Sequence, residues 1–130
     1  MWSDSSDPHR FEARIEPIAP FPPAARDAGF ALHLRITNAG DTRWMDGPPD
    51  RRGTVCVGVQ RVRPDGEIVE RDYFRIPLPR AVTPGESVEI RATVPLRPGA
   101  GRHFAVDLGA EHICWFFHHG SRCLSFEVGD

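Results

Sequence analysis

The sequence contains no lysine, so all 16 of its basic residues are arginine, against 18 acidic residues. The formal net charge is −2 and the arginines form no basic run, so the electrostatic footprint of a nucleic-acid-binding protein is missing. Two explanations of the arginine excess stay open. It can reflect a GC-rich coding bias, or it can provide a surface suited to bidentate contacts with carboxylates and sugar hydroxyls.

Long apolar stretches are missing as well. No segment approaches the ~18 consecutive apolar residues of a membrane span. Residues 1–7 have neither the basic nor the apolar region of a signal peptide, and the chain has only three cysteines. We therefore expect a cytoplasmic protein with free thiols and no membrane span.

The 130 residues fit one globular domain, and a chain of this length needs no disulfide or metal to fold. Thirteen prolines and twelve glycines favour short strands and turns, and no segment has a persuasive helical period. Residues 1–10 are polar and are expected to be disordered. Residues 11–130 are expected to form the single domain.

Apolar and polar residues alternate along most of the chain. In residues 30–37, Phe30, Leu32, Leu34 and Ile36 fall on one face, which is typical of a half-buried antiparallel strand. Similar segments cover residues 11–15, 55–59, 67–76, 88–94, 104–108 and 124–128. Two prolines after residue 76 place the segment 67–76 at a sheet edge. The pattern predicts an all-β fold, an immunoglobulin-like antiparallel β-sandwich of about seven strands.

The alternation is least clear from Gly109 to Ser121. If residues 113–117 pair with 121–127 in a hairpin, Trp115 points inward and Phe116 points outward. A slip of one residue reverses both, because successive side chains of a strand point to opposite faces. Whether Trp115 is exposed therefore depends on the register, which the sequence leaves open.

Two patches of sequence resemble a known family. The first is Leu34-Arg35-Ile36-Thr37-Asn38-Ala39-Gly40-Asp41-Thr42-Arg43-Trp44; the second runs from Pro84-Gly85-Glu86 through Pro98–Arg102 and Asp107-Leu108 to Cys114-Trp115-Phe116. Together they resemble the immunoglobulin-like domain found beside bacterial glycosyltransferases and methyltransferases of polysaccharide biosynthesis. The layout is similar to the sugar-binding C-terminal domain of O-antigen ABC transporters. A weaker similarity is to the four-tryptophan domain of autophagy receptors, although one of the three tryptophans, Trp2, lies outside the predicted domain. The resemblance implies an accessory role in binding a glycan or a protein.

Large aromatic rings are the main candidates for ligand contact. Sugar binders stack the apolar faces of pyranoses on such rings, and nearby polar groups bind the hydroxyls. The predicted ligand-binding residues are Trp44, Tyr73, Arg75, Asp107, Trp115 and Phe116, with Glu111 as a further polar partner. The alternative is that these rings fill the core, where most aromatic residues of small domains lie.

A metal site is a weaker alternative. Its candidate ligands are His112, Cys114, His118 and Cys123, residue types that bind zinc. Their spacing matches no common zinc module, so the alternative of free thiols and a polar loop stays open. A disulfide between Cys114 and Cys123 is not expected in a reducing compartment.

No convincing catalytic set is present. The sequence has no nucleophile elbow and no phosphate-binding loop. Two pairs have suitable residue types but no recognisable catalytic motif around them: Ser121 with His118 or His119, and Asp107 with Glu111. We therefore expect no enzymatic activity and no cofactor, and predict a module that binds a bacterial polysaccharide or a glycan intermediate. A protein–protein interaction or structural accessory domain is the alternative, with self-association through an edge strand as one form of it.

Overall fold

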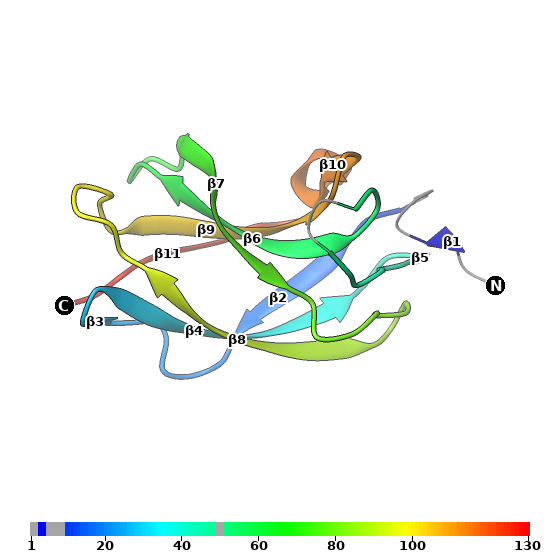
Figure 1. Cartoon of the computed structure of the whole chain (residues 1–130), viewed down its shortest axis with the longest axis horizontal. Helices are drawn as coiled ribbons and strands as arrows, with labels where there is room; N and C mark the ends of the chain where they lie inside the picture. The colour runs from blue at the N-terminus through cyan, green and yellow to red at the C-terminus, as the bar shows by residue number, and fades with distance from the viewer. Residues whose placement is uncertain (1–2, 5–9, 49–50) are drawn as a thin grey trace.

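The computed structural model describes residues 3–4, 10–48 and 51–130, with the backbone alone at Ser3, Asp4 and His119. Two antiparallel sheets pack face to face as a β-sandwich (Figure 1). The predicted all-β, immunoglobulin-like fold is therefore confirmed. Of the predicted disordered segment, residues 1–2 and 5–9 lie outside the described residues, and so does Trp2. Ser3 and Asp4 form a short strand, β1, that pairs in parallel with β5 (Thr42–Arg43).

The first sheet is built around one long central strand. Its members are β2 (Ala13–Pro17), β3 (Ala25–Arg26), β4 (Gly29–Asn38) and β8 (Ser87–Pro95). β4 pairs with β2 and β3 along one side and with β8 along the other. The alternation predicted for residues 30–37 therefore corresponds to the central strand of this sheet.

The second sheet carries the region of functional interest. Its members are β6 (Val55–Val62), β7 (Ile68–Pro77), β9 (His103–Ala110), β10 (Cys114–Trp115) and β11 (Leu124–Glu127). β6 lies between β7 and β9, while β10 and β11 both pair with the far side of β9. β7 is thus at an edge, as the prolines after residue 76 predict.

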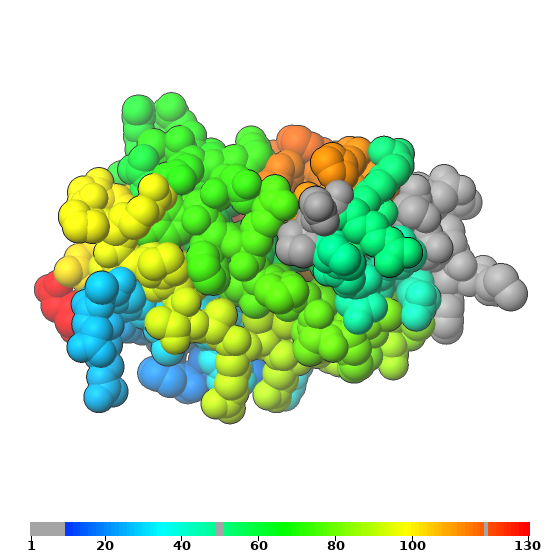
Figure 2. All heavy atoms as spheres, in the orientation of Figure 1, coloured from blue at the N-terminus to red at the C-terminus, as the bar shows by residue number. Residues whose placement is uncertain are grey.

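The core lies between the two sheets, where side chains fill the space that separates the ribbons of Figure 1 (Figure 2). Each strand contributes alternate side chains to it, because period two puts every second residue on the inner face. The buried residues of β4, β6 and β9 that form its centre are Phe30, Leu32, Leu34, Ile36, Val55, Val57, Val59, Phe104, Val106 and Leu108. The outer face of the second sheet holds the other residues of the same strands, including Gly58, Gln60 and Gly109.

Residues 113–117 do not pair with residues 121–127 in the hairpin considered from the sequence. β10 pairs with β9 at Ala110 and Gly109, and β11 pairs with an earlier part of β9. A 3₁₀ turn, η1 (Phe116–His119), separates them and ends at Gly120, whose φ of 85° is in the left-handed region that suits glycine. Trp115 points outward because it pairs with Gly109, an outer-face position of β9, whereas Phe116, the first residue of η1, is buried in the core.

Within the described part of the chain, no helix has the length and apolar character needed to cross a bilayer.

Candidate ligand-binding site

Three of the four predicted rings belong to the core. Trp44 and Phe116 are both 0% exposed, and Tyr73 is 8% exposed. Phe116 stacks on Phe11 with ring centroids 4.3 Å apart and meets Trp44 edge to face at 5.4 Å. Tyr73 packs elsewhere, against Phe104 at 5.2 Å, so the prediction that Trp44, Tyr73 and Phe116 gather at the surface is wrong.

Tyr73 has a structural role, because its hydroxyl group forms hydrogen bonds with the backbone of the other sheet. Its hydroxyl donates a hydrogen bond to the Pro95 carbonyl at 2.6 Å and accepts one from the Arg97 amide at 3.1 Å. The Arg97 guanidinium also lies 4.4 Å from the centre of the ring. Tyr73 therefore links β7 of the second sheet to the end of β8 of the first.

Asp107 is buried on the outer face of β9 beneath η1. Its carboxylate accepts hydrogen bonds from its neighbour's amide, Leu108 N, at 2.8 Å and from Phe117 N at 3.1 Å. Burial raises the pKa of Asp107, and the two backbone hydrogen bonds oppose part of that rise. Because backbone amides occupy this carboxylate and only 1% of the residue is exposed, it is not available as the predicted ligand contact.

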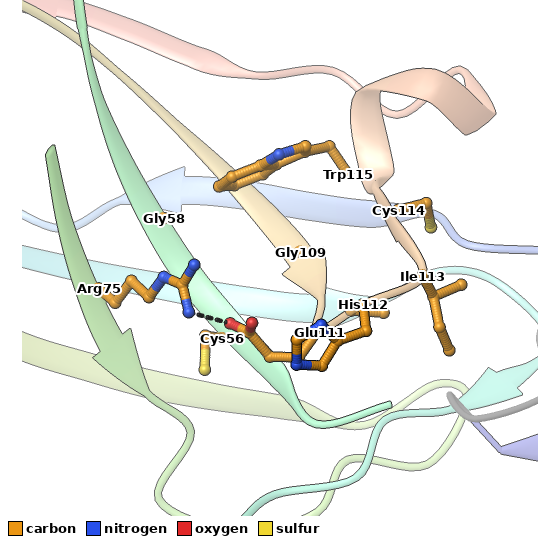
Figure 3. Close-up of a pocket in the computed structure, with 10 residues that line it drawn as sticks. Cys56, Gly58, Arg75, Gly109, Glu111, His112, Ile113, Cys114 and Trp115 are labelled. Carbon is orange, nitrogen blue, oxygen red and sulfur yellow. Dashed lines mark hydrogen bonds and ion pairs between the residues drawn. The ribbon is translucent and has the colours of Figure 1, made fainter. Parts of the chain in front are cut away.

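Trp115 differs from the other three rings. Its indole lies across the outer face of the second sheet, over the two positions where β6 and β9 carry glycine (Figure 3). A methyl group added at Gly58 would lie 2.5 Å from Cζ3 of the indole, and one at Gly109 would lie 3.3 Å from Cε3. The two glycines therefore let the ring approach the backbone of both strands, and this contact fixes its orientation.

A charged pair borders the indole. Arg75 on β7 donates to the Glu111 carboxylate at 2.6 Å and to Asp72 at 2.8 Å, and only 12% of the Glu111 side chain is exposed. Between this pair and Trp115 is a hollow of about 380 Å³ (Figure 3). The predicted residues Trp115 and Arg75 thus line one hollow, with Glu111 beside them.

Cys56 lies on the floor of this hollow. Its thiol is nearly buried, and burial together with the Glu111 carboxylate raises its pKa to about 11. The thiol is therefore protonated at neutral pH, which makes it a poor nucleophile and a poor metal ligand.

Comparisons with known proteins leave the family open. No family model matches the sequence, and no curated protein matches it. A structure similar to this chain is that of beta-glucosidase 3B from Thermotoga neapolitana in complex with alpha-D-glucose, with a TM-score of 0.42 and 15% identity. The match covers 99% of this chain and 17% of that chain. A likeness of this size carries no information on function.

The alternative metal set is not assembled. No three His, Cys, Asp or Glu side chains are grouped closely enough to hold a metal ion, counting only residues that the structure describes. All three cysteines are free thiols, so Cys114 and Cys123 form no disulfide. The Ser121 hydroxyl accepts a hydrogen bond from Ala13 N at 3.0 Å and is buried, which ties the last loop to β2.

Sequence reasoning missed the floor of the site. Gly58 and Gly109 each interrupt an apolar strand, and a lone glycine inside a strand pattern is a sign of close approach by another group. That signal was available in the sequence. The neighbouring Arg71, whose guanidinium lies 5.9 Å from the centre of the Trp115 ring, had no comparable signal because its position depends on the β6–β7 bulge.

Proposed function

We propose that the protein is a non-catalytic carbohydrate-binding module whose platform is Trp115. The observation that supports this most is the flat placement of the indole on Gly58 and Gly109, beside the Arg75–Glu111 pair. An aromatic ring attracts the weakly positive C–H groups of a pyranose face through its π cloud. The carboxylate and guanidinium beside it can accept from and donate to the sugar hydroxyls.

The fixed ring favours binding for an entropic reason. A ligand that must first order a mobile side chain loses part of the interaction energy in doing so. Here the indole is already held by the backbone of two strands, and Asp72 and Glu111 already hold Arg75. The expected affinity per sugar is modest, because one ring and a few hydroxyl contacts make a small interface.

The family resemblance supports the same ligand class. The patch that ends at Trp44 and the patch that includes Trp115 resemble immunoglobulin-like domains beside polysaccharide-synthesis enzymes. In this proposal only the second patch contributes a ligand contact. The first patch contributes Asn38, whose buried side-chain amide donates to the carbonyls of Thr42 at 2.8 Å and Val82 at 3.0 Å, and it thereby supports the fold.

A glycan array followed by titration calorimetry tests the proposal. We expect the wild-type protein to bind at least one class of glycan, and Trp115→Ala to weaken that binding at least about tenfold, a loss of about 1.4 kcal/mol. Val69→Ala is the control, since Val69 is also an exposed apolar residue but lies outside the hollow. Circular dichroism of both variants verifies that the fold is intact. Unchanged glycan affinity in folded Trp115→Ala would contradict the proposal.

A second candidate is a protein-interaction surface. Phe117, on η1, is 56% exposed, and with Val69 it makes up the exposed large apolar residues of the described chain. Aromatic residues are enriched at protein–protein interfaces relative to the rest of a protein surface. Size-exclusion chromatography with light scattering would favour this candidate if a dimer mass is found and Phe117→Ser returns it to the monomer.

A further inference from the structure

Arg71 is an unpaired cation beside the platform. It is exposed, and its guanidinium lies 5.9 Å from the centre of the Trp115 ring. No ion pair or hydrogen bond joins its side chain to any residue that the structure describes. Arg75, four residues later on the same strand, is instead neutralised by Asp72 and Glu111. Of these two arginines, Arg71 is therefore the one whose guanidinium no carboxylate of a described residue contacts directly; the buried Asp107 carboxylate acts on it only through space.

Gln60 is a buried amide that opens into a neighbouring groove. It is 1% exposed and lines a groove of about 200 Å³ together with Arg71, Phe117 and the apolar side chains of Val62 and Ile68. Its side chain makes no hydrogen bond with a described residue. Among the described residues, two side-chain polar atoms are both inaccessible to solvent and without a hydrogen-bond partner, namely Trp44 Nε1 and Thr54 Oγ1. The Gln60 amide also has no partner but is not one of them, so it remains accessible from the groove.

A buried amide without a partner is costly, and a ligand hydroxyl that bonds to it would remove that cost. Gln60 is two residues from Gly58 on the same outer face of β6, a distance of about 7 Å along the strand. That is the scale of one sugar residue. Arg71 lines the groove, and its guanidinium lies beside the Trp115 ring, which lines the hollow, so Arg71 lies between the two.

We infer that the ligand is an acidic oligosaccharide. One uronate ring stacks on Trp115 with its carboxylate on Arg71, and the next sugar of the chain enters the groove, where its hydroxyls bond to Gln60. The inference rests on the proposed function and adds the charge and the minimum length of the ligand. A planar carboxylate matches the two parallel N–H groups of a guanidinium, so arginine suits a uronate. Arg71 is exposed and can turn from the indole to the carboxylate.

The experiment compares each acid with its own neutral form. Calorimetry is done with a panel of uronate tetrasaccharides (galacturonate, glucuronate, mannuronate and guluronate) and with the methyl ester of each, which keeps the sugar and removes the charge. We expect at least one acid to bind wild-type protein about tenfold more tightly than its ester, as expected for one charge-assisted contact. Arg71→Gln should remove the preference for the acid, so that the ratio of acid affinity to ester affinity falls to about one.

The control is Arg91→Gln, which makes the same change of charge at an exposed arginine on β8 of the other sheet. It should keep the preference for the acid. Equal binding of acid and ester by wild-type protein would overturn the inference and leave the proposed function standing. Binding of a sulfated oligosaccharide but of no uronate would overturn the choice of carboxylate. Absence of binding to every glycan would overturn both proposals.

Gln60→Met tests the length of the site. Methionine has a similar size but forms no strong hydrogen bond, so the core beneath it should be kept. In wild-type protein we expect the tetrasaccharide to bind more tightly than the single uronic acid, and in Gln60→Met we expect this gain to shrink about threefold to tenfold. An undiminished gain from chain length would overturn the placement of the second sugar in the groove.

Discussion

Trp44 and Trp115 occupy opposite environments in one small sandwich. Trp44 is wholly buried at one end, where its amide and carbonyl bond to Val82 and its ring meets Phe116. Trp115 lies on the outside of the second sheet with glycines beneath it. The residue type alone therefore does not show whether a tryptophan lies in the core or on the surface. The residues beneath the ring show it, because glycine leaves a flat stretch of backbone on which an indole can lie.

Stability should separate the two environments most strongly. Phe116 packs on both Phe11 and Trp44, so Phe116→Ala should lower the unfolding free energy of the protein by about 3–5 kcal/mol, since the surrounding core cannot refill the space. Trp115→Ala should lower it by at most about half as much, because part of the ring faces water. Urea denaturation of both variants measures the difference. Equal losses would mean that Trp115 is a core residue.

The ring contact with Gly58 gives the next largest effect. Gly58→Ala places a methyl group where the indole lies, so the ring must lift from the sheet. We expect glycan affinity to fall about tenfold while the unfolding free energy changes little. Calorimetry and a urea titration of the same sample verify both parts. Wild-type affinity in this variant would show that the flat placement of the ring is irrelevant to binding.

The buried carboxyl group of Asp107 should make the unfolding free energy of the protein depend on pH. Burial raises its pKa in the folded state, so the folded protein binds more protons than the unfolded chain between the ordinary value of 3.8 and the raised value. Its contribution to stability is therefore fully present below 3.8 and declines as the pH rises through this interval. Asp107→Asn should remove that decline, and urea titrations at several pH values measure it. Identical pH profiles in both proteins would contradict the burial of this carboxyl group.

Gly109→Ala should have the smallest effect. Its methyl group would lie 3.3 Å from the indole, which a shift of a few tenths of an ångström relieves. We expect less than about a threefold loss of glycan affinity. Calorimetry beside Gly58→Ala gives the ranking, and a larger loss in Gly109→Ala than in Gly58→Ala would reverse the assigned contacts.

The regular strands were predictable because alternation specifies which face is buried. Phe30 to Ile36 and Val88 to Val94 are apolar at every second residue, and they pair as β4 and β8. The segment after Gly109 was not predictable in the same way. There the exposure of each ring depends on whether a hairpin or a 3₁₀ turn forms, and residues 116–119 have no alternation that favours either.

The candidate site was predictable in part for a related reason. Trp115 and Arg75 could be chosen by residue type, but residue type also chose the core rings Trp44 and Phe116. The glycines that distinguish Trp115 come from two strands far apart in the sequence, and their approach to one ring depends on the pairing of Gly58 with Asp107 and of Gly109 with Cys56. A pairwise register of this kind cannot be read from one strand alone.

The indole N–H signals in a ¹H–¹⁵N correlation spectrum report directly whether the ligand contacts Trp115. The protein is titrated with the glycan found by the array, and the three indole signals are assigned by single Trp→Phe variants. We expect a saturable shift of the Trp115 signal with the Trp44 signal unmoved, because one ring is the platform and the other is sealed in the core. A Trp115 signal that stays fixed while the ligand saturates the protein would contradict the role of Trp115 as the platform.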